Sequence, residues 1–122
     1  MRRSILMAGA LAISAVLTAA PAFAADGAFA HDESTGKYGL SWNEKNPRAA
    51  EEAALKGCAS SQCKVVFRTT TGECGAIAMN DSGKVWGGAK RPSREAAQLA
   101  AIENCQKRTG GQCKIRGAEC NR

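Results

Sequence analysis

The sequence predicts a small α+β protein of two pseudo-repeated β-β-α-β modules, in which two Ala-rich helices pack on an antiparallel sheet and disulfides staple the chain. Three observations predict this fold class: an N-terminal export signal, an internal repeat, and six cysteines that all follow the signal. The cysteines are Cys58, Cys63, Cys74, Cys105, Cys113 and Cys120. An even number of cysteines in a short exported chain is typical of a disulfide framework, because a small core needs covalent support.

Residues 1–24 have the features of a cleavable signal peptide. Two arginines precede an apolar run, and Ala22-Phe23-Ala24 places small residues at the two positions that a signal peptidase reads. We expect cleavage after Ala24, with Ala28-Phe29-Ala30 as the weaker alternative. The apolar run is shorter than the roughly 20 residues that a membrane anchor needs. The sequence therefore predicts a periplasmic or extracellular protein, residues 25–122, without a membrane span.

The remaining chain repeats itself. Gly27-Ala28-Phe29-Ala30 recurs as Gly75-Ala76-Ile77-Ala78, and residues 36–58 can be laid on residues 83–105 without gaps. Further matches at Gly-Lys and Cys-Lys positions outside the alanine runs indicate duplication rather than shared composition. We expect one duplicated domain, with a first copy over about residues 27–74 and a second over about 75–120.

Each copy predicts two strands, a helix and a third strand. In the first copy the strands are residues 27–31, a segment carrying Tyr38 and Trp42, and residues 64–68, with a helix that Asn46 caps and Cys58 ends. In the second copy they are residues 75–80, a segment carrying Trp86, and residues 114–117, with a helix that Ser93 caps and that reaches Cys105. The helix faces are rich in alanine, so each helix can lie close against a sheet.

These elements rank the disulfide pairings without deciding among them. Cys58 ends a helix and Cys63 opens the next strand, which favours Cys58–Cys63 and the equivalent Cys105–Cys113 as local bridges. Cys74 and Cys120 are then left to join the two copies. Cys58–Cys74 is a less favoured alternative, because Cys74 is expected at the far end of the third strand.

The sequence contains no catalytic constellation. His31 is the only histidine; one histidine makes no site by itself, and we expect it in a solvated turn near the mature N-terminus. Glu51 and Glu52 are neighbours on a helix and do not face each other as a pair of catalytic carboxylates must. The intervals between cysteines do not fit the paired ligands of a zinc site. We expect no enzyme activity, no metal and no cofactor.

The candidate binding residues are basic side chains around an aromatic one: Lys84, Trp86, Lys90, Arg91 and Arg94. An aromatic ring between cations can stack on a sugar while the charges hold an anion. In the simpler interpretation Trp86 is a core anchor and the charges keep the surface solvated. Nucleic acid is not expected as a partner, because no binding motif is present, the net charge after removal of residues 1–24 is only 15 − 11 = +4, and an exported protein seldom meets nucleic acid.

Four motifs occur in a characteristic order. They are Tyr38-Gly39-Leu40-Ser41-Trp42, an Ala-rich helix ending in Cys58, Cys63-Lys64-Val65-Val66-Phe67 followed by Cys74, and Gly75-Ala76-Ile77-Ala78 with its earlier echo. In this order and cysteine placement the chain resembles the bacterial domain of unknown function 4189 family, over nearly the whole mature length. The resemblance implies an exported, compact, cysteine-bearing domain and supplies no catalytic residues.

The sequence therefore predicts an exported, non-catalytic, disulfide-bonded domain that binds an anionic envelope component or another exported protein. The alternative is a periplasmic inhibitor or immunity protein directed against a toxin or hydrolase, a role to which small disulfide-bonded scaffolds are suited.

Overall fold

The computed structural model describes residues 24–122, and the predicted signal peptide lies outside them apart from Ala24. The chain forms two units with the same order of elements. The first unit contains β1 (Asp26–His31), β2 (Tyr38–Glu44), α1 (Pro47–Cys58) and β3 (Lys64–Thr69). The second contains β4 (Cys74–Met79), β5 (Trp86–Arg91), α2 (Arg94–Thr109) and β6 (Lys114–Cys120). The predicted α+β class and the β-β-α-β order are confirmed.

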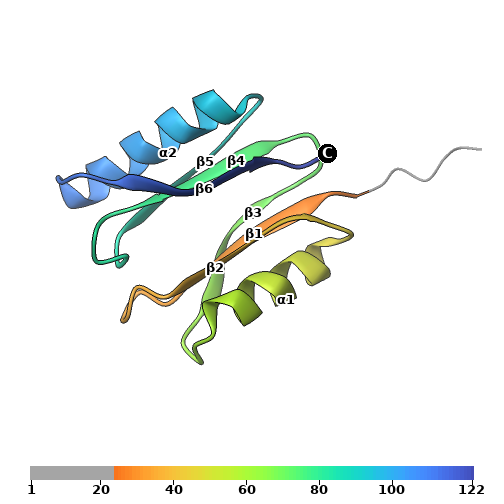
Figure 1. Ribbon diagram of the computed structural model, residues 1–122, viewed down its shortest axis with the longest axis horizontal. Coiled ribbons are helices and arrows are strands. Elements are labelled where there is room, and N and C mark those ends of the chain that lie inside the picture. Colours follow the sequence, from red (N-terminus) through yellow and green to blue (C-terminus); the bar gives the residue numbers. More distant parts are fainter. Residues whose placement is uncertain (1–23) are drawn as a thin grey trace, which may run out of the picture.

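Each unit has its own three-stranded antiparallel sheet. The strand orders are β2-β1-β3 and β5-β4-β6, so the first strand of each unit lies in the centre of its sheet. The two sheets face each other, and one helix covers the outer face of each (Figure 1). The result is a four-layer arrangement of helix, sheet, sheet and helix.

The central strands of the two sheets are buried on both faces. On β1, Ala28 and Ala30 pack with Ala50 and Ala54 of α1, while Phe29 points to the opposite face. Alternate side chains of a strand lie on opposite faces, so the alanines meet the helix and the larger residue meets the other sheet. The same division holds in β4, where Ala76 and Ala78 meet α2.

The core between the sheets is built from larger side chains. Phe29, Ile77 and Met79 are fully buried there, and Leu40, Phe67 and Trp86 pack against them. The rings of Phe29 and Trp86 have centroids 4.9 Å apart. Trp86 is therefore an anchor between the two units, as the simpler interpretation of this residue expects.

The helices begin where their capping residues predict. The Asn46 side chain accepts a hydrogen bond from the Ala49 amide at 2.7 Å, and the Ser93 hydroxyl accepts one from the Ala96 amide at 3.2 Å. A side-chain oxygen at this position satisfies an amide that has no partner within the helix. The helices end at residues in the left-handed region, Ala59 with φ 59° and Gly110 with φ 69°.

Close packing of each helix on its sheet depends on one glycine in the neighbouring strand. A Cβ on Gly39 would collide with the Ala54 carbonyl oxygen, and a Cβ on Gly87 would collide with the backbone nitrogen of Cys105. These glycines are equivalent, since Gly39 pairs with Ala30 and Gly87 pairs with Ala78.

We expect Gly87→Ala to lower the free energy of unfolding by about 1–3 kcal/mol, because the helix must move off the sheet. Gly57→Ala, inside α1, is the matched control: its Cβ would lie 3.5 Å from Gly39 Cα, an ordinary contact. Alanine is a better helix former than glycine, so that variant should gain up to about 1 kcal/mol. Urea unfolding measures both, and equal effects would contradict this account of Gly87.

The three favoured disulfide pairings are present: Cys58–Cys63, Cys74–Cys120 and Cys105–Cys113. The expected role of Cys74–Cys120 is wrong. Cys74 opens β4 and pairs across the second sheet with Cys120 at the end of β6, so this bridge lies within the second unit and does not join the two units. The last strand also reaches Cys120, beyond the predicted end at residue 117.

The gapless overlay of the two copies is also wrong by one residue inside β2. Asp26 pairs with Glu44 and Ala28 pairs with Ser41, which leaves Trp42 and Asn43 opposite the single residue Gly27. Strand β5 has no such bulge against β4. Asn43, with φ 56°, therefore has no counterpart in the second unit.

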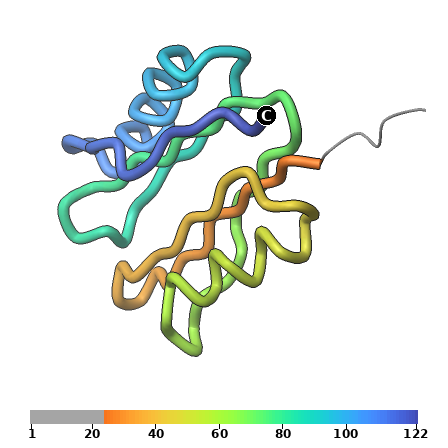
Figure 2. Tube along the Cα trace, turned by 45° about the vertical axis from the view of Figure 1, so that its right-hand side comes forward, coloured from red at the N-terminus to blue at the C-terminus, as the bar shows by residue number. Residues whose placement is uncertain are grey.

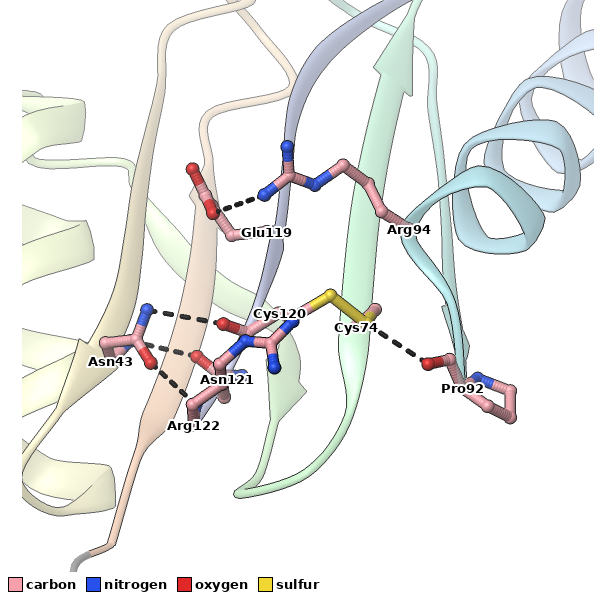
Figure 3. A network of polar contacts seen from close by, with 8 residues as sticks. All are labelled: Asn43, Cys74, Pro92, Arg94, Glu119, Cys120, Asn121 and Arg122. Atoms are coloured by element: carbon pink, nitrogen blue, oxygen red, sulfur yellow. Dashed lines mark hydrogen bonds and ion pairs between the residues drawn. A yellow bond between two sulfur atoms is a disulfide. The ribbon is translucent and has the colours of Figure 1, made fainter.

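The bulge at Asn43 joins the units in place of a disulfide. The Asn43 side chain accepts a hydrogen bond from the Arg122 amide at 2.8 Å and donates to the Cys120 carbonyl at 3.4 Å (Figure 3). Its own amide donates to the side-chain oxygen of Asn121, a fully buried residue, at 2.9 Å. The end of the second unit is thus fixed to the first, and the two ends of the described chain lie at the same end of the molecule (Figure 2).

Candidate functional site

The molecule has two ends with different chemistry. We call the one that carries the β1–β2 and β4–β5 turns, residues 32–37 and 80–85, the turn end; the other, which carries residues 24–26 and 121–122, is the terminal end (Figure 1). The two turns touch: a Cβ on Gly36 would collide with the Ser82 carbonyl oxygen, and one on Gly83 would lie 2.9 Å from the Gly36 carbonyl oxygen. Both glycines have positive φ, 83° and 75°, which glycine adopts without strain.

The structure divides the candidate binding residues between these ends. Lys84 and Trp86 lie at the turn end of β5, whereas Lys90, Arg91 and Arg94 lie at or beyond its other end. The five residues therefore do not form one cluster. Trp86 is half-buried and the four basic residues are exposed.

Several basic residues of the terminal end have partners within the protein, whereas Lys45, Arg91 and Arg122 form no ion pair among the described residues. Arg94 forms an ion pair with Glu119 at 3.0 Å (Figure 3), and Arg68 forms one with Glu51 at 2.7 Å. The Lys90 ammonium lies over the Phe67 ring, 5.7 Å from its centroid. These basic side chains therefore contact other side chains of the protein itself.

The turn end carries exposed cations that form no ion pair within residues 24–122. They are Lys37, Lys56, Lys64, Lys84, Lys107, Arg108 and Lys114. Among residues 24–122 all three ion pairs, counting Arg48 with Glu52, lie at the terminal end. Arg108 differs from the lysines, because its guanidinium lies over the Trp86 ring at 5.1 Å and donates to the Trp86 carbonyl at 3.2 Å.

Charge is also unequal between the units. Residues 74–122 hold nine Lys and Arg against four Asp and Glu, a net charge of +5, whereas residues 24–73 hold six against seven, a net charge of −1. The net positive charge of residues 24–122 therefore lies in the second unit. Lys107 and Lys114 flank the turn after α2 and were not among the predicted binding residues. The basic pair Lys107-Arg108 near the end of a predicted helix is the sequence feature that points to this region.

A cleft of about 270 Å³ opens at the turn end between the units. The first unit lines it with the end of β1, the turn that follows, Gln62 and part of β3, and the second unit with the start of β5. The lining residues are His31, Asp32, Glu33, Ser34, Gln62, Lys64, Val66 and Trp86. The cleft joins polar groups of the first unit to the aromatic anchor of the second.

His31 is buried, with 4% of its surface exposed, which corrects the expected solvated turn. It is the last residue of β1, its ring stacks on Phe29 at 5.7 Å, and its Nε2–H donates to the Gly83 carbonyl at 2.7 Å. The physical reason is its position in the strand, two residues after Phe29, which turns it toward the other unit. His31 thus ties the two turns together.

Asp32 is buried beside His31 and organises the first turn. Its carboxylate accepts hydrogen bonds from the hydroxyls of Ser34 at 2.6 Å, Ser60 at 2.7 Å and Thr35 at 2.9 Å. These bonds, led by that of Ser34, hold the pKa of the Asp32 carboxyl well below its usual range. Asn80, the residue after β4, accepts from the Val85 amide at 3.1 Å and organises the second turn without a charge.

The low pKa of Asp32 predicts an acid-dependent loss of stability. Its carboxylate stabilises the fold above the ordinary pKa of 3.8, and that contribution is lost as the pH falls below this value toward the folded-state pKa. Asp32→Asn should lower the urea midpoint at pH 7 and flatten its dependence between about pH 5 and pH 2. Asn80→Asp places a carboxylate in the second turn and tests whether it gives the same pH dependence there. Parallel pH profiles for parent and Asp32→Asn would contradict this assignment.

The described part of the chain places no group of three or more His, Cys, Asp or Glu side chains where it could hold a metal ion. All six cysteines are in disulfides. None of the helices within residues 24–122 has the length and apolar character needed to cross a membrane.

Over residues 27–120 the chain matches the family described as Domain of unknown function (DUF4189). The chain belongs to this family. Two mycobacterial relatives are similar to this DUF4189 chain. The uncharacterized protein Rv1813c of Mycobacterium tuberculosis is 38% identical over 80 residues, which cover 66% of this chain and 52% of that protein. Protein Rv1269c of the same species is 40% identical over 67 residues, which cover 55% and 51%.

The chain spans about half the length of these curated relatives. The NMR structure of Rv1813c from Mycobacterium tuberculosis is similar over 86% of this chain and 81% of that one, with a TM-score of 0.56 and 30% sequence identity. The fold of this chain is therefore similar to that of a solved mycobacterial relative.

Proposed function

We propose that the protein is an exported, non-catalytic domain that binds an anionic polymer of the cell envelope through its turn end. The observation that carries the proposal is the contrast between the two ends: Arg48, Arg68 and Arg94 of the terminal end form ion pairs, and the lysines of the turn end form none among the described residues. Unpaired cations gathered on one surface attract a polyanion, whereas charges already paired contribute little.

Export is supported by the covalent structure. Three disulfides close within residues 58–120, and such bonds persist in oxidising compartments outside the cytoplasm. They fit the signal peptide that the sequence predicts. An envelope polymer is then a partner that the protein meets after export.

A non-catalytic role is supported by the state of the reactive side chains. The cysteines are all oxidised in disulfides, and His31 is buried with Nε2 held by the Gly83 carbonyl. A nucleophile and a base within hydrogen-bond reach of each other, as covalent catalysis requires, are not found among these groups.

Co-sedimentation with isolated cell envelopes tests the proposal, using the exported, oxidised protein in a salt titration. The turn-end variant replaces three unpaired lysines by serine: Lys84, Lys107 and Lys114. The matched terminal-end variant removes the same charge from exposed residues: Lys45, Arg91 and Arg122. We expect the turn-end variant to bind about tenfold more weakly at low salt, with a shallower salt dependence, and the terminal-end variant to bind within about twofold of the parent.

Equal losses in both variants would show that binding follows net charge alone and would overturn the turn-end assignment. Absence of envelope binding by the parent at low salt would overturn the function itself.

A further inference from the structure

The cleft at the turn end has two chemically different walls. Val66, with 41% of its surface exposed, and half-buried Trp86 provide apolar surface. Gln62, Lys64 and Glu33 are exposed and provide an amide, a cation and a carboxylate on the other lining positions. A pyranose ring has the same division, because its C–H groups are apolar and its hydroxyls donate and accept hydrogen bonds.

The Asp32 carboxylate and the His31 Nε2, deeper in the cleft, already have hydrogen-bond partners. Asp32 accepts three hydroxyl hydrogen bonds, and the His31 Nε2 is held by Gly83. We therefore expect a ligand to contact the exposed groups of the lining: the Gln62 amide, the Lys64 ammonium and the Glu33 carboxylate. These three offer donors and an acceptor for hydroxyls.

One cation lines the cleft and a second contacts its aromatic residue. Lys64 lines it directly, and Arg108 lies over the Trp86 ring at 5.1 Å. Glu33 is the one exposed carboxylate in the lining, and it forms no ion pair with Lys64 among the described residues. A ligand that carries one carboxylate can place it at Lys64 and present a hydroxyl to Glu33.

We propose that this cleft binds one acidic sugar residue, a pyranose bearing a carboxylate. The proposal rests on the function proposed above and names the unit of the polymer that the turn end recognises. The cleft volume of about 270 Å³ lies just below the range of about 300–1,000 Å³ for drug-sized ligands, so it suits a single sugar ring. The surrounding lysines hold the neighbouring charged units of the polymer.

Amide NMR shifts of the oxidised protein test this site during titration with three probes. The probes are trigalacturonate, the neutral trisaccharide galactotriose, and tripolyphosphate, which is anionic and has no sugar. We expect trigalacturonate to shift the amides of residues 31–34, 62–66 and 86 and to bind at least about tenfold more tightly than galactotriose. Tripolyphosphate should shift the amides beside Lys84, Lys107 and Lys114 and leave the cleft unchanged.

Lys64→Met removes the cation and keeps the aliphatic stem, and Lys45→Met, at an exposed position of the terminal end between β2 and α1, is the matched control. We expect about a tenfold loss of trigalacturonate affinity for Lys64→Met and less than a twofold loss for Lys45→Met, with both variants folded by circular dichroism. Equal shifts of the cleft amides with trigalacturonate and tripolyphosphate, or no shift of these amides with the sugar, would overturn the proposed sugar site and leave the proposed function standing. Failure of every anion to bind, together with failure of envelope binding, would overturn both.

Discussion

Removal of the Cys74–Cys120 bridge is expected to lower the free energy of unfolding by about 4 kcal/mol. The two cysteines are separated by 46 residues, and a crosslink of that span restricts the unfolded chain more than a short one does. The variant is Cys74→Ala/Cys120→Ala, so that no free thiol remains, and urea unfolding gives the free energy.

The control is Cys58→Ala/Cys63→Ala, which opens a bridge with a sequence separation of five. The same relation predicts a loss of about 2 kcal/mol for this shorter loop. The free energy of unfolding should therefore fall more in Cys74→Ala/Cys120→Ala than in Cys58→Ala/Cys63→Ala. Equal losses would contradict a stabilisation that acts through the unfolded chain.

Phe29→Ala is expected to cost about 3–5 kcal/mol, a large part of the stability of a small protein. Phe29 is fully buried between the two sheets and contacts the rings of His31, Tyr38 and Trp86. Its truncation leaves a cavity in the core that holds the units together.

Leu99→Ala is the matched control, because this residue of α2 is 66% exposed and should change the stability by no more than about 0.5 kcal/mol. Urea unfolding followed by tryptophan fluorescence measures both variants. If Phe29→Ala and Leu99→Ala unfold at the same urea concentration, the inter-sheet core does not hold the units together.

The topology of each unit could be predicted because its signals are local. Asn46 and Ser93 cap the helices where expected, and the cysteines at the helix ends pair with those that open the next strands. Such contacts join residues close in sequence, so the pattern of one segment is enough to indicate them.

The arrangement of the two sheets could not be predicted in the same way. All six residues of β1 and all six of β4 are buried, so these strands lack the alternation of apolar and polar residues that assigns faces. The interior position of His31 depends on which layer covers the second face of β1. It could not be known before the two sheets were placed against each other.

The candidate site was predicted in part. Lys84 and Trp86 lie at the turn end, as their closeness in sequence suggests, but Arg94 is paired with Glu119, a residue that only the β4–β6 pairing brings near. Lys107 and Lys114 join Lys84 because α2 runs back toward the turn. Ion pairs and surface clusters of this kind depend on tertiary contacts, and charge counting along the chain does not reveal them.

The most direct test of the central claim is an amide NMR map of the oxidised protein titrated with the anionic polymer purified from the envelope. We predict salt-sensitive shifts confined to the turn end, in residues 32–37, 59–66, 80–86 and 107–114. Shifts centred instead on residues 44–48, 90–94 and 119–122 would contradict the account, because those residues lie at the end that holds the three ion pairs.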